Sequence, residues 1–188
     1  MMVDADLALI EAIGKGDHCA FEKLIERYQN PVLNFITRHL GDRYMAEDLT
    51  QEVFLRVYRA APRFRPKAKV VSWIFKIAYN LSINEIRRRS RLARRAVDMQ
   101  LATEEVGNET SAECVARYEV EEEIAVALKS LPENQRAALL LKVNEGLSYT
   151  EISEALEVSV ASVESLLFRA RKNLKKLLRE TLSGEKER

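Results

Sequence analysis

The stretch from Ser148 to Lys176 carries polar and cationic side chains that can contact DNA. In its second half, apolar residues fall on one side of a helix, while hydroxyl groups and cations fall on the other. Such groups reach base edges and phosphates in a major groove. A basic outer face can equally be the solvated side of a plain helical bundle. The outward set consists of Ser162, Ser165, Arg169, Arg171 and Lys172.

A second set lies along one line of the helix expected at 71–91. At 100° per residue its members fall within about 40° of that line, opposite the apolar side. Amides can read the edges of unpaired bases, and arginines bind the flanking phosphates. The alternative is that Trp73 fills the core and the arginines are merely solvated. The row consists of Trp73, Asn80, Asn84, Arg87 and Arg91.

The loop before this helix, APRFRPKAK at 61–69, combines two prolines with several cations and one aromatic residue. Prolines restrict the backbone, and cations attract phosphate. The ring of Phe64 can stack on an unpaired base. The loop and the helix together predict a surface for single-stranded nucleic acid.

The helix expected at 44–60 presents acidic side chains beside aromatic ones. Positions 45, 49, 53, 57 and 60 are expected to face inward, which leaves Asp48, Gln51 and Glu52 on the outside. We expect Phe54 and Tyr58 to lie exposed beside these acids, as aromatic residues do at protein interfaces. A solvated face and a protein-binding face are equally compatible with this pattern.

Two short helices joined by a tight turn must position the first set. The sequence SYTEISEALEVSVASVESLLFRARKNLKK predicts a helix-turn-helix, because Ser148 and Glu151 form a capping box and apolar residues follow at core spacing. Ser130 and Glu133 predict a second capping box. Glu157 stands in the turn, where glycine would avoid a cost of about 1 kcal/mol.

The front half is expected to be helical throughout, since no run of alternating apolar residues predicts a strand. Asp17 can cap a second helix, and Asn30 with Pro31 predicts the start of a third, which ends at Gly41. The stretch at 96–120 is acidic and aperiodic, which predicts a flexible linker. We therefore expect an all-α protein of two small helical domains.

The distribution of charge divides the chain into the same two domains and linker. Residues 1–95 hold 18 Lys/Arg and 11 Asp/Glu, residues 96–128 hold 1 and 9, and residues 129–188 hold 11 and 9. Two basic-leaning segments flank an acidic one, which suggests two modules that face nucleic acid and a connector that avoids it.

Other function classes find little support in the 188 residues. No apolar run approaches the ~20 residues that span a bilayer, and the start of the chain does not resemble a signal peptide, so we expect a cytoplasmic protein without membrane insertion. Cys19 and Cys114 are far apart, and only two histidines are present, so neither metal nor disulfide is expected. Without a phosphate-binding loop or an activated nucleophile, we expect neither an enzyme nor a cofactor.

The combined motifs resemble the extracytoplasmic-function (ECF) group of sigma-70-type sigma factors. The resemblance covers residues 5–180 and rests on DLTQEVFLRVYRA, FRP, SWIFKIAYNLSINEIRRR, SLPENQRAALLLKVNEGLSYTEISEAL and VESLLFRARKNL. It implies a sigma2-like domain at 1–95, a linker at 96–120, a sigma4-like domain at 121–182 and a frayed tail at 183–188.

The resemblance also implies partners and roles. The expected partners are the clamp helices and flap of bacterial core RNA polymerase, promoter DNA and an anti-sigma protein, with a monomer when free. Asp48, Gln51, Glu52 and Phe54 match polymerase-binding positions. The −10 element would be contacted and melted by Phe64, Arg65, Lys67, Lys69, Trp73, Asn80, Asn84, Arg87 and Arg88. The −35 element would be contacted by Lys142, Ser162, Ser165, Phe168, Arg169, Arg171 and Lys172.

Departures and rivals remain. Glu164 and Leu166 stand where the family often has basic residues, so the −35 preference is expected to depend more on Ser165, Arg169 and Arg171. One rival is a helix-turn-helix regulator that acts without polymerase and binds duplex DNA as a dimer. Another is a metal-dependent nuclease or recombinase, for which Asp48 and Glu52 at i, i+4 are weak evidence.

Overall fold

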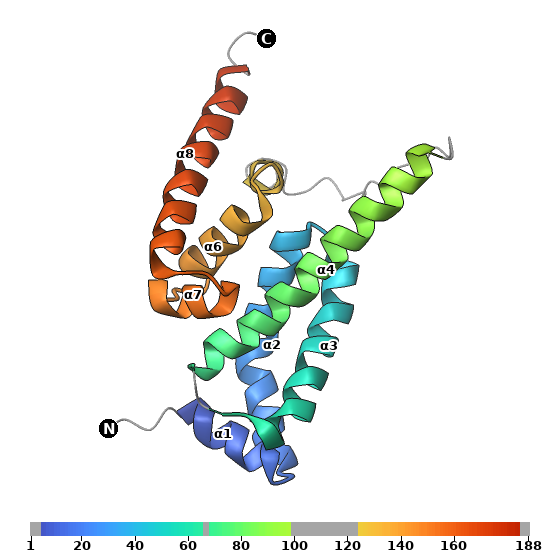
Figure 1. The fold of residues 1–188 in the computed structure, drawn as a ribbon, viewed down its shortest axis with the longest axis vertical. Coiled ribbons are helices and arrows are strands. Elements are labelled where there is room, and N and C mark those ends of the chain that lie inside the picture. The colour runs from blue at the N-terminus through green and yellow to red at the C-terminus, as the bar shows by residue number, and fades with distance from the viewer. Residues whose placement is uncertain (1–4, 66–67, 99–123, 185–188) are drawn as a thin grey trace, which may run out of the picture.

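The computed structural model describes residues 5–65, 68–98 and 124–184 (Figure 1). In these ranges the chain is helical and contains no strand, which confirms the predicted all-α class. None of the described helices is both long and apolar enough to cross a membrane. The elements are α1 (Ala5–Gly14), α2 (His18–Leu40), α3 (Arg43–Ala60), the 3-10 helix η1 (Ala61–Arg63), α4 (Val70–Asp98), a short helix at 124–129, α6 (Glu133–Val143), α7 (Tyr149–Leu156) and α8 (Val160–Gly184).

Helix α2 begins where predicted but does not break at Pro31. The Asp17 carboxylate caps it by accepting from the Ala20 amide at 3.1 Å, and Gly41 ends it in the left-handed conformation with φ of 71°. Proline lacks an amide and removes one helical hydrogen bond. The buried stripe of Leu24, Val32 and Phe35 continues in register across the proline, so packing holds α2 as one helix. The prediction of a separate third helix was therefore wrong.

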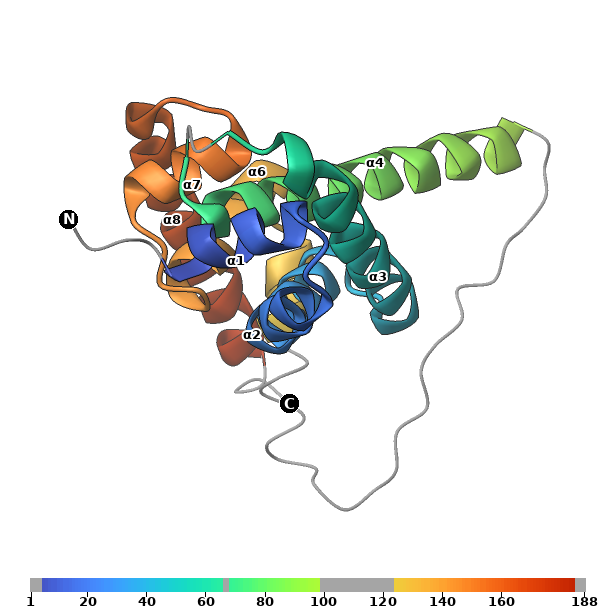
Figure 2. The ribbon, with the colours of Figure 1, turned by 90° about the horizontal axis from the view of Figure 1, so that it is seen from below.

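Helix α4 is the long element that positions the predicted base-contacting row. Ile74, Phe75, Ala78 and Leu81 are buried on its inner side, as the periodicity predicted. It continues to Asp98, beyond the predicted domain end at 95, and its last turns extend away from the other helices (Figure 2). The rest of the predicted linker lies outside the described residues.

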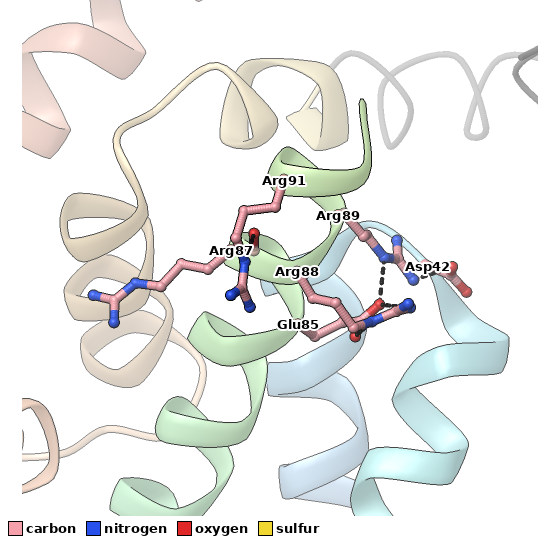
Figure 3. A network of polar contacts seen from close by, with 6 residues as sticks. All are labelled: Asp42, Glu85, Arg87, Arg88, Arg89 and Arg91. Carbon is pink, nitrogen blue, oxygen red and sulfur yellow. Dashed lines mark hydrogen bonds and ion pairs between the residues drawn. The ribbon is translucent and has the colours of Figure 1, made fainter. Parts of the chain in front are cut away.

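A polar network fixes α4 against α3 (Figure 3). The buried carboxylate of Glu85 accepts from Arg88 at 2.7 and 2.8 Å and from Arg89 at 2.7 Å. Arg89 also donates to Asp42 at 2.8 Å, and Asp42 caps α3 by accepting from the Met45 amide at 3.0 Å. The bonds from Arg88, with those from Arg89, hold the pKa of Glu85 below its usual value, although burial acts in the opposite direction. The network therefore joins α4 to the start of α3 through one buried charge.

The helix-turn-helix forms at α7 and α8 as predicted. Ser148 accepts from the Glu151 amide at 3.2 Å, and the Glu151 carboxylate accepts from the Ser148 amide at 2.7 Å, which completes the capping box. Glu157 takes the left-handed conformation in the turn with φ of 56°, the position where glycine is common.

Two boundary predictions in the second domain were wrong. The Ser130 hydroxyl donates to the Val126 carbonyl at 3.0 Å and caps nothing, because Pro132 intervenes and α6 begins only at Glu133. Helix α8 continues to Gly184, so positions 183 and 184 of the predicted frayed tail are helical. The tail beyond them lies outside the described residues.

The two domains pack on each other, with α7 against α4 and α6 against α2. The guanidinium of Arg136 in α6 is buried and donates to the His39 carbonyl at 2.7 Å and to the Leu131 carbonyl at 3.3 Å. The His39 ring is fully buried between Phe35 and Tyr79, with Nε2 at 3.3 Å from the Glu133 carbonyl. One hydrophobic core therefore runs through both domains.

The buried ring of His39 makes stability dependent on pH. Burial, assisted by the positive charge of Arg136, lowers the pKa of His39 from 6.5 to about 4, against a weaker opposing effect of the Glu133 carbonyl. As pH falls from 6.5 towards 4, His39 therefore takes up a proton in the unfolded chain but stays neutral in the folded protein. We expect the free energy of unfolding to fall by about 2 kcal/mol between pH 7.5 and pH 5.

Urea denaturation at the two pH values measures this effect. His39→Gln is expected to remove most of the dependence, because glutamine does not titrate. His18→Gln is the matched control, since His18 lies exposed at the start of the same helix. An equal pH dependence in the His39 variant and the parent would contradict the assignment.

The network around Glu85 predicts a second stability difference. Glu85→Gln keeps the side-chain shape but replaces charged bonds to two arginines, so we expect a loss of about 1–2 kcal/mol at pH 7.5. Glu47→Gln is the control, because Glu47 makes an exposed pair with Arg43 of the kind worth about 0.3–0.5 kcal/mol.

The loss should shrink as pH falls below 4.5, the ordinary pKa of glutamate. A lowered native pKa stabilises the fold above that value and ceases to do so once the carboxyl is protonated in both states. Urea denaturation at pH 7.5 and pH 3 checks both statements, and equal losses in the two variants would refute them.

Candidate nucleic-acid interface

The predicted row on α4 lies on its solvent side. Asn80, Asn84, Arg87 and Arg91 are all exposed, on the side away from Ile74 and Ala78. The inner side of the helix is buried, so the row is presented by a rigid support. This arrangement can bring two amides and two guanidinium groups to one strand of nucleic acid.

The two aromatic residues of the predicted −10 surface touch each other. The rings of Phe64 and Trp73 lie 4.5 Å apart between centroids at an angle of 46°, and both are half-buried. Trp73 therefore neither fills the core completely nor lies free, and it supports the ring of Phe64. Together they form an aromatic platform at the start of α4 on which a base can stack.

The cations of the preceding loop have different surroundings. Arg65 is exposed and donates to the Phe64 carbonyl at 3.3 Å. Lys69 pairs with Glu151 of the capping box, with 2.8 Å between the ammonium and the carboxylate oxygen. Lys67 lies outside the described residues.

Arg88 does not belong to the row. It lies about 80° around the helix from Asn80, and its guanidinium bonds to Glu85 on the side facing α3 (Figure 3). Arg87 points away from that network. The sequence marked a run of arginines but not the buried acid that holds two of them. Arg88 keeps an exposed side chain, and its contact with the −10 element stays a prediction.

A hollow of about 690 Å³ lies beside the C-terminal part of the row. Three guanidinium groups line it, and Glu133 at the start of α6 supplies the acidic side chain of the lining. The hollow is therefore shared by the two domains and is predominantly positive. Its lining residues are Asn84, Arg87, Ser90, Arg91, Arg94 and Glu133.

The outer face of α8 is exposed as predicted. Phe168 is the most exposed apolar side chain there, at 69%. The Ser162 hydroxyl lies 2.8 Å from the hydroxyl of Ser159, which caps the helix by accepting from the Ser162 amide at 3.1 Å. Glu164 is exposed on the same helix. The exposed set of predicted −35 residues is Ser162, Ser165, Phe168, Arg169, Arg171 and Lys172.

Lys142 is placed differently from those residues. Its ammonium donates to the Leu147 carbonyl at 3.0 Å and lies 5.5 Å from the centre of the Tyr149 ring. Lys142 therefore holds the loop that leads from α6 to α7.

The face of α3 differs from the prediction at one residue. Asp48 and Gln51 are exposed and Glu52 is partly exposed, but Phe54 is buried at 6%. The buried stripe runs through positions 46, 50, 53, 54 and 57, so it is rotated relative to the expected inward set. The exposed position expected for Phe54 was wrong.

Two exposed apolar side chains on this face were missed by the sequence reasoning. Tyr44 is exposed by 80% and Leu55 by 47%, while the predicted Tyr58 is exposed by 36%. Together with Asp48 and Gln51 they follow spacings of four and three residues, which is the period of a coiled-coil seam. That spacing is the sequence signal by which the two residues could have been predicted. We name the set of Tyr44, Asp48, Gln51, Leu55 and Tyr58 the α3 seam.

Metal binding has little support in the part of the chain that the structure describes. No group of three His, Cys, Asp or Glu side chains comes together there. Glu52, the i, i+4 neighbour of Asp48, accepts instead from Arg56 at 2.7 Å. Cys19 is exposed, and Cys114 lies outside the described residues.

Comparisons with known proteins identify the family of both domains. Residues 24–92 match the family model of sigma-70 region 2, and residues 121–174 match that of sigma-70 region 4. The chain is 33% identical to the RNA polymerase sigma-H factor of Pseudomonas aeruginosa, covering 95% of this chain and 96% of that protein. It is also 33% identical to the ECF RNA polymerase sigma-E factor of Haemophilus influenzae, covering 88% of this chain and 91% of that protein.

A solved structure has the same fold over nearly the whole chain. It is that of CnrH in complex with the cytosolic domain of CnrY, with a TM-score of 0.72, 25% identity, and coverage of 94% of this chain and 99% of the other. Both matched regions occur in the order expected of a sigma factor, and the similarities do not favour a regulator that acts without polymerase. The chain belongs to the extracytoplasmic-function group of sigma-70-type RNA polymerase sigma factors.

Proposed function

We propose that this sigma factor divides promoter opening among three of its helices. Helix α3 binds core RNA polymerase, α4 with its preceding loop captures and opens the −10 element, and α8 reads the −35 element. The observation that carries the proposal is the exposed row of Asn80, Asn84, Arg87 and Arg91 on a helix whose other side is buried.

The α3 seam supports polymerase binding. Its spacing suits packing against a helical partner of coiled-coil type, and the clamp helices that the resemblance implies are such a partner. Tyr44 and Leu55 supply apolar contact, and Asp48 supplies a charge that can fix orientation. The buried Phe54 would then support the face from below without touching polymerase.

The loop before α4 and the row on α4 support strand opening. Extruding a base costs a few kcal/mol of stacking, which a pocket recovers through stacking and hydrogen bonds. The platform of Phe64 and Trp73 provides a stacking surface, and the Asn80 amide lies on the solvent side of the same helix. Arg87 and Arg91 would bind the flanking phosphates and make the affinity depend on salt.

The outer face of α8 supports reading of the −35 element. Arg169 and Ser165 are exposed groups that can contact base edges, and Arg171 and Lys172 can bind phosphates. Exposed Glu164 would repel phosphate and restrict how α8 lies in the groove. The flap of polymerase and an anti-sigma protein complete the proposed partners, since CnrH is itself in complex with CnrY.

In-vitro transcription with purified core polymerase tests the division of roles. Asn80→Ala is expected to reduce promoter melting, detected by permanganate reactivity of thymines, while polymerase binding in a pull-down stays unchanged. Asp48→Arg is expected to weaken polymerase binding, because it inverts a charge within the α3 seam, and to reduce melting only as far as polymerase binding is lost. The two variants are controls for each other.

Each of the two variants has a result that would contradict its assigned role. Loss of polymerase binding in Asn80→Ala would place Asn80 outside the DNA surface, and unchanged binding in Asp48→Arg would exclude the α3 seam as the docking face. Asn34→Ala, at an exposed position on α2, should affect neither reaction.

Arg169→Ala tests the assignment of α8. If the guanidinium contacts a base, the variant should lose about 1–3 kcal/mol of discrimination at one position of the −35 element. Run-off transcription from promoters with single substitutions in that element measures this. An equal loss on every promoter would mean that Arg169 contacts phosphate and not a base.

A further inference from the structure

An exposed carboxylate lies on the outer side of α8 among groups that are cationic or neutral. Glu164 is exposed, whereas Val163 and Leu167 on the inner side of the helix are buried. Phe168 lies one turn further along and about 40° around the helix from Glu164, and its side chain is 69% exposed. The carboxylate therefore lies on the surface that the proposed function assigns to the −35 element.

The stability of the helix does not explain an acid at this position. Acidic side chains stabilise a helix by pairing with cations three or four residues away, or by lying in its first turn. The side chains at those distances from Glu164 are Val160, Ala161, Leu167 and Phe168, and none of them is cationic. Helix α8 begins at Val160, so Glu164 lies beyond the first turn. The carboxylate is therefore presented to a partner outside the helix.

A carboxylate in the major groove can be satisfied by only two of the four bases. It accepts hydrogen bonds and donates none, and the donors at the edges of the bases in this groove are the amino groups of adenine and cytosine. The amino group of adenine lies beside the acceptor N7, which repels a carboxylate and suits an amide. Cytosine presents its amino group with no acceptor of the same base beside it in the groove. A carboxylate therefore selects cytosine.

The apolar side chains beside Glu164 strengthen this selection. Ala161 and Phe168 are exposed before and after it along the helix, and such groups contact the methyl group of thymine in the groove. When the helix lies in the groove, they exclude water from the carboxylate, and a hydrogen bond is stronger in a dry environment. A base without a donor then leaves the carboxylate desolvated and unpaired, which costs more than the bond itself contributes.

We propose that Glu164 is a specificity-determining residue of this sigma factor, which selects cytosine at one position of the −35 element by accepting a hydrogen bond from the 4-amino group. Guanine and thymine present only acceptors at their edges in the groove and are rejected. Ser165 and Arg169 lie on the other side of Phe168 around the helix, so they read other positions of the element. The inference rests on the proposed function for the placement of α8 in the major groove.

In-vitro transcription with the full chain and purified core polymerase measures the preference. The −35 element is varied one position at a time through all four bases. We expect the parent to prefer cytosine at one position by about fivefold or more over each other base. Glu164→Gln should move that preference to adenine, because a glutamine amide bonds to both N6 and N7 of adenine, and Glu164→Ala should abolish it.

Glu22→Gln is the matched control, because Glu22 is an exposed acid on α2 and the change removes the same charge. Its base preferences should equal those of the parent. A parent without a preference for cytosine at any position, or Glu164 variants with the preference of the parent, would overturn the proposal. An equal rise in transcription from every promoter in both Glu164 variants would also overturn it, because the carboxylate would then act only by repelling phosphate.

Removal of the amino group from the DNA tests the same hydrogen bond from the other side. The deoxynucleoside of 2-pyrimidinone pairs with guanine but lacks the 4-amino group, so at the preferred position it should lower transcription by the parent about fivefold. The same replacement should change transcription by Glu164→Ala by less than about twofold, because that variant already lacks the bond. Equal losses in the parent and in Glu164→Ala would contradict the assignment.

Failure of the proposed function would give a different result from failure of this inference. Transcription that does not depend on the −35 element at all would contradict the role of α8 and the cytosine contact together. Transcription that depends on the element, with the same base preferences in the parent and in both Glu164 variants, would overturn the cytosine contact alone.

Discussion

The burial of Arg136 is the constraint on which the arrangement of the two domains depends. A guanidinium keeps its charge in any protein environment, so burying one requires acceptors at its position. Arg136 finds them in the carbonyls of His39 and Leu131, and the first of these lies in the last turn of α2, where helix carbonyls carry partial negative charge. That contact fixes α6 on α2. Because α7 follows α6 after a short loop that Lys142 holds by its bond to Leu147, the position of α7 over α4 follows from the same contact.

Four parts of the surface of helix α4 have different surroundings. Its apolar side completes the first core, Glu85 and Arg89 tie it to the cap of α3, its exposed row is available to nucleic acid, and its N-terminal turns receive α7. A helix held from three directions has little freedom to rearrange its own side chains. The exposed row on α4 is therefore presented in a fixed arrangement.

The features that depend on local residue spacing and side-chain type were predicted correctly from the sequence. The capping box at Ser148, the cap at Asp17, the turn at Gly41 and the row on α4 all follow from spacing and side-chain type, and they were found from the sequence. Pro31 and Phe54 were placed wrongly because packing around them decided the outcome. A continuous buried stripe carried α2 through the proline, and a rotation of α3 buried the phenylalanine. The bond between Arg88 and the buried carboxylate of Glu85 was likewise not visible in the sequence. The pairing of Lys69 with Glu151 joins positions 82 residues apart, and no pattern in a single sequence predicts it.

The Lys69–Glu151 pair joins the two domains at the surface of the molecule. The Lys69 ammonium lies 2.8 Å from the Glu151 carboxylate, and the lysine side chain remains 66% exposed. Exposed ion pairs contribute little each. The packing of α7 on α4 therefore depends more on the hydrophobic core that runs through both domains than on this pair.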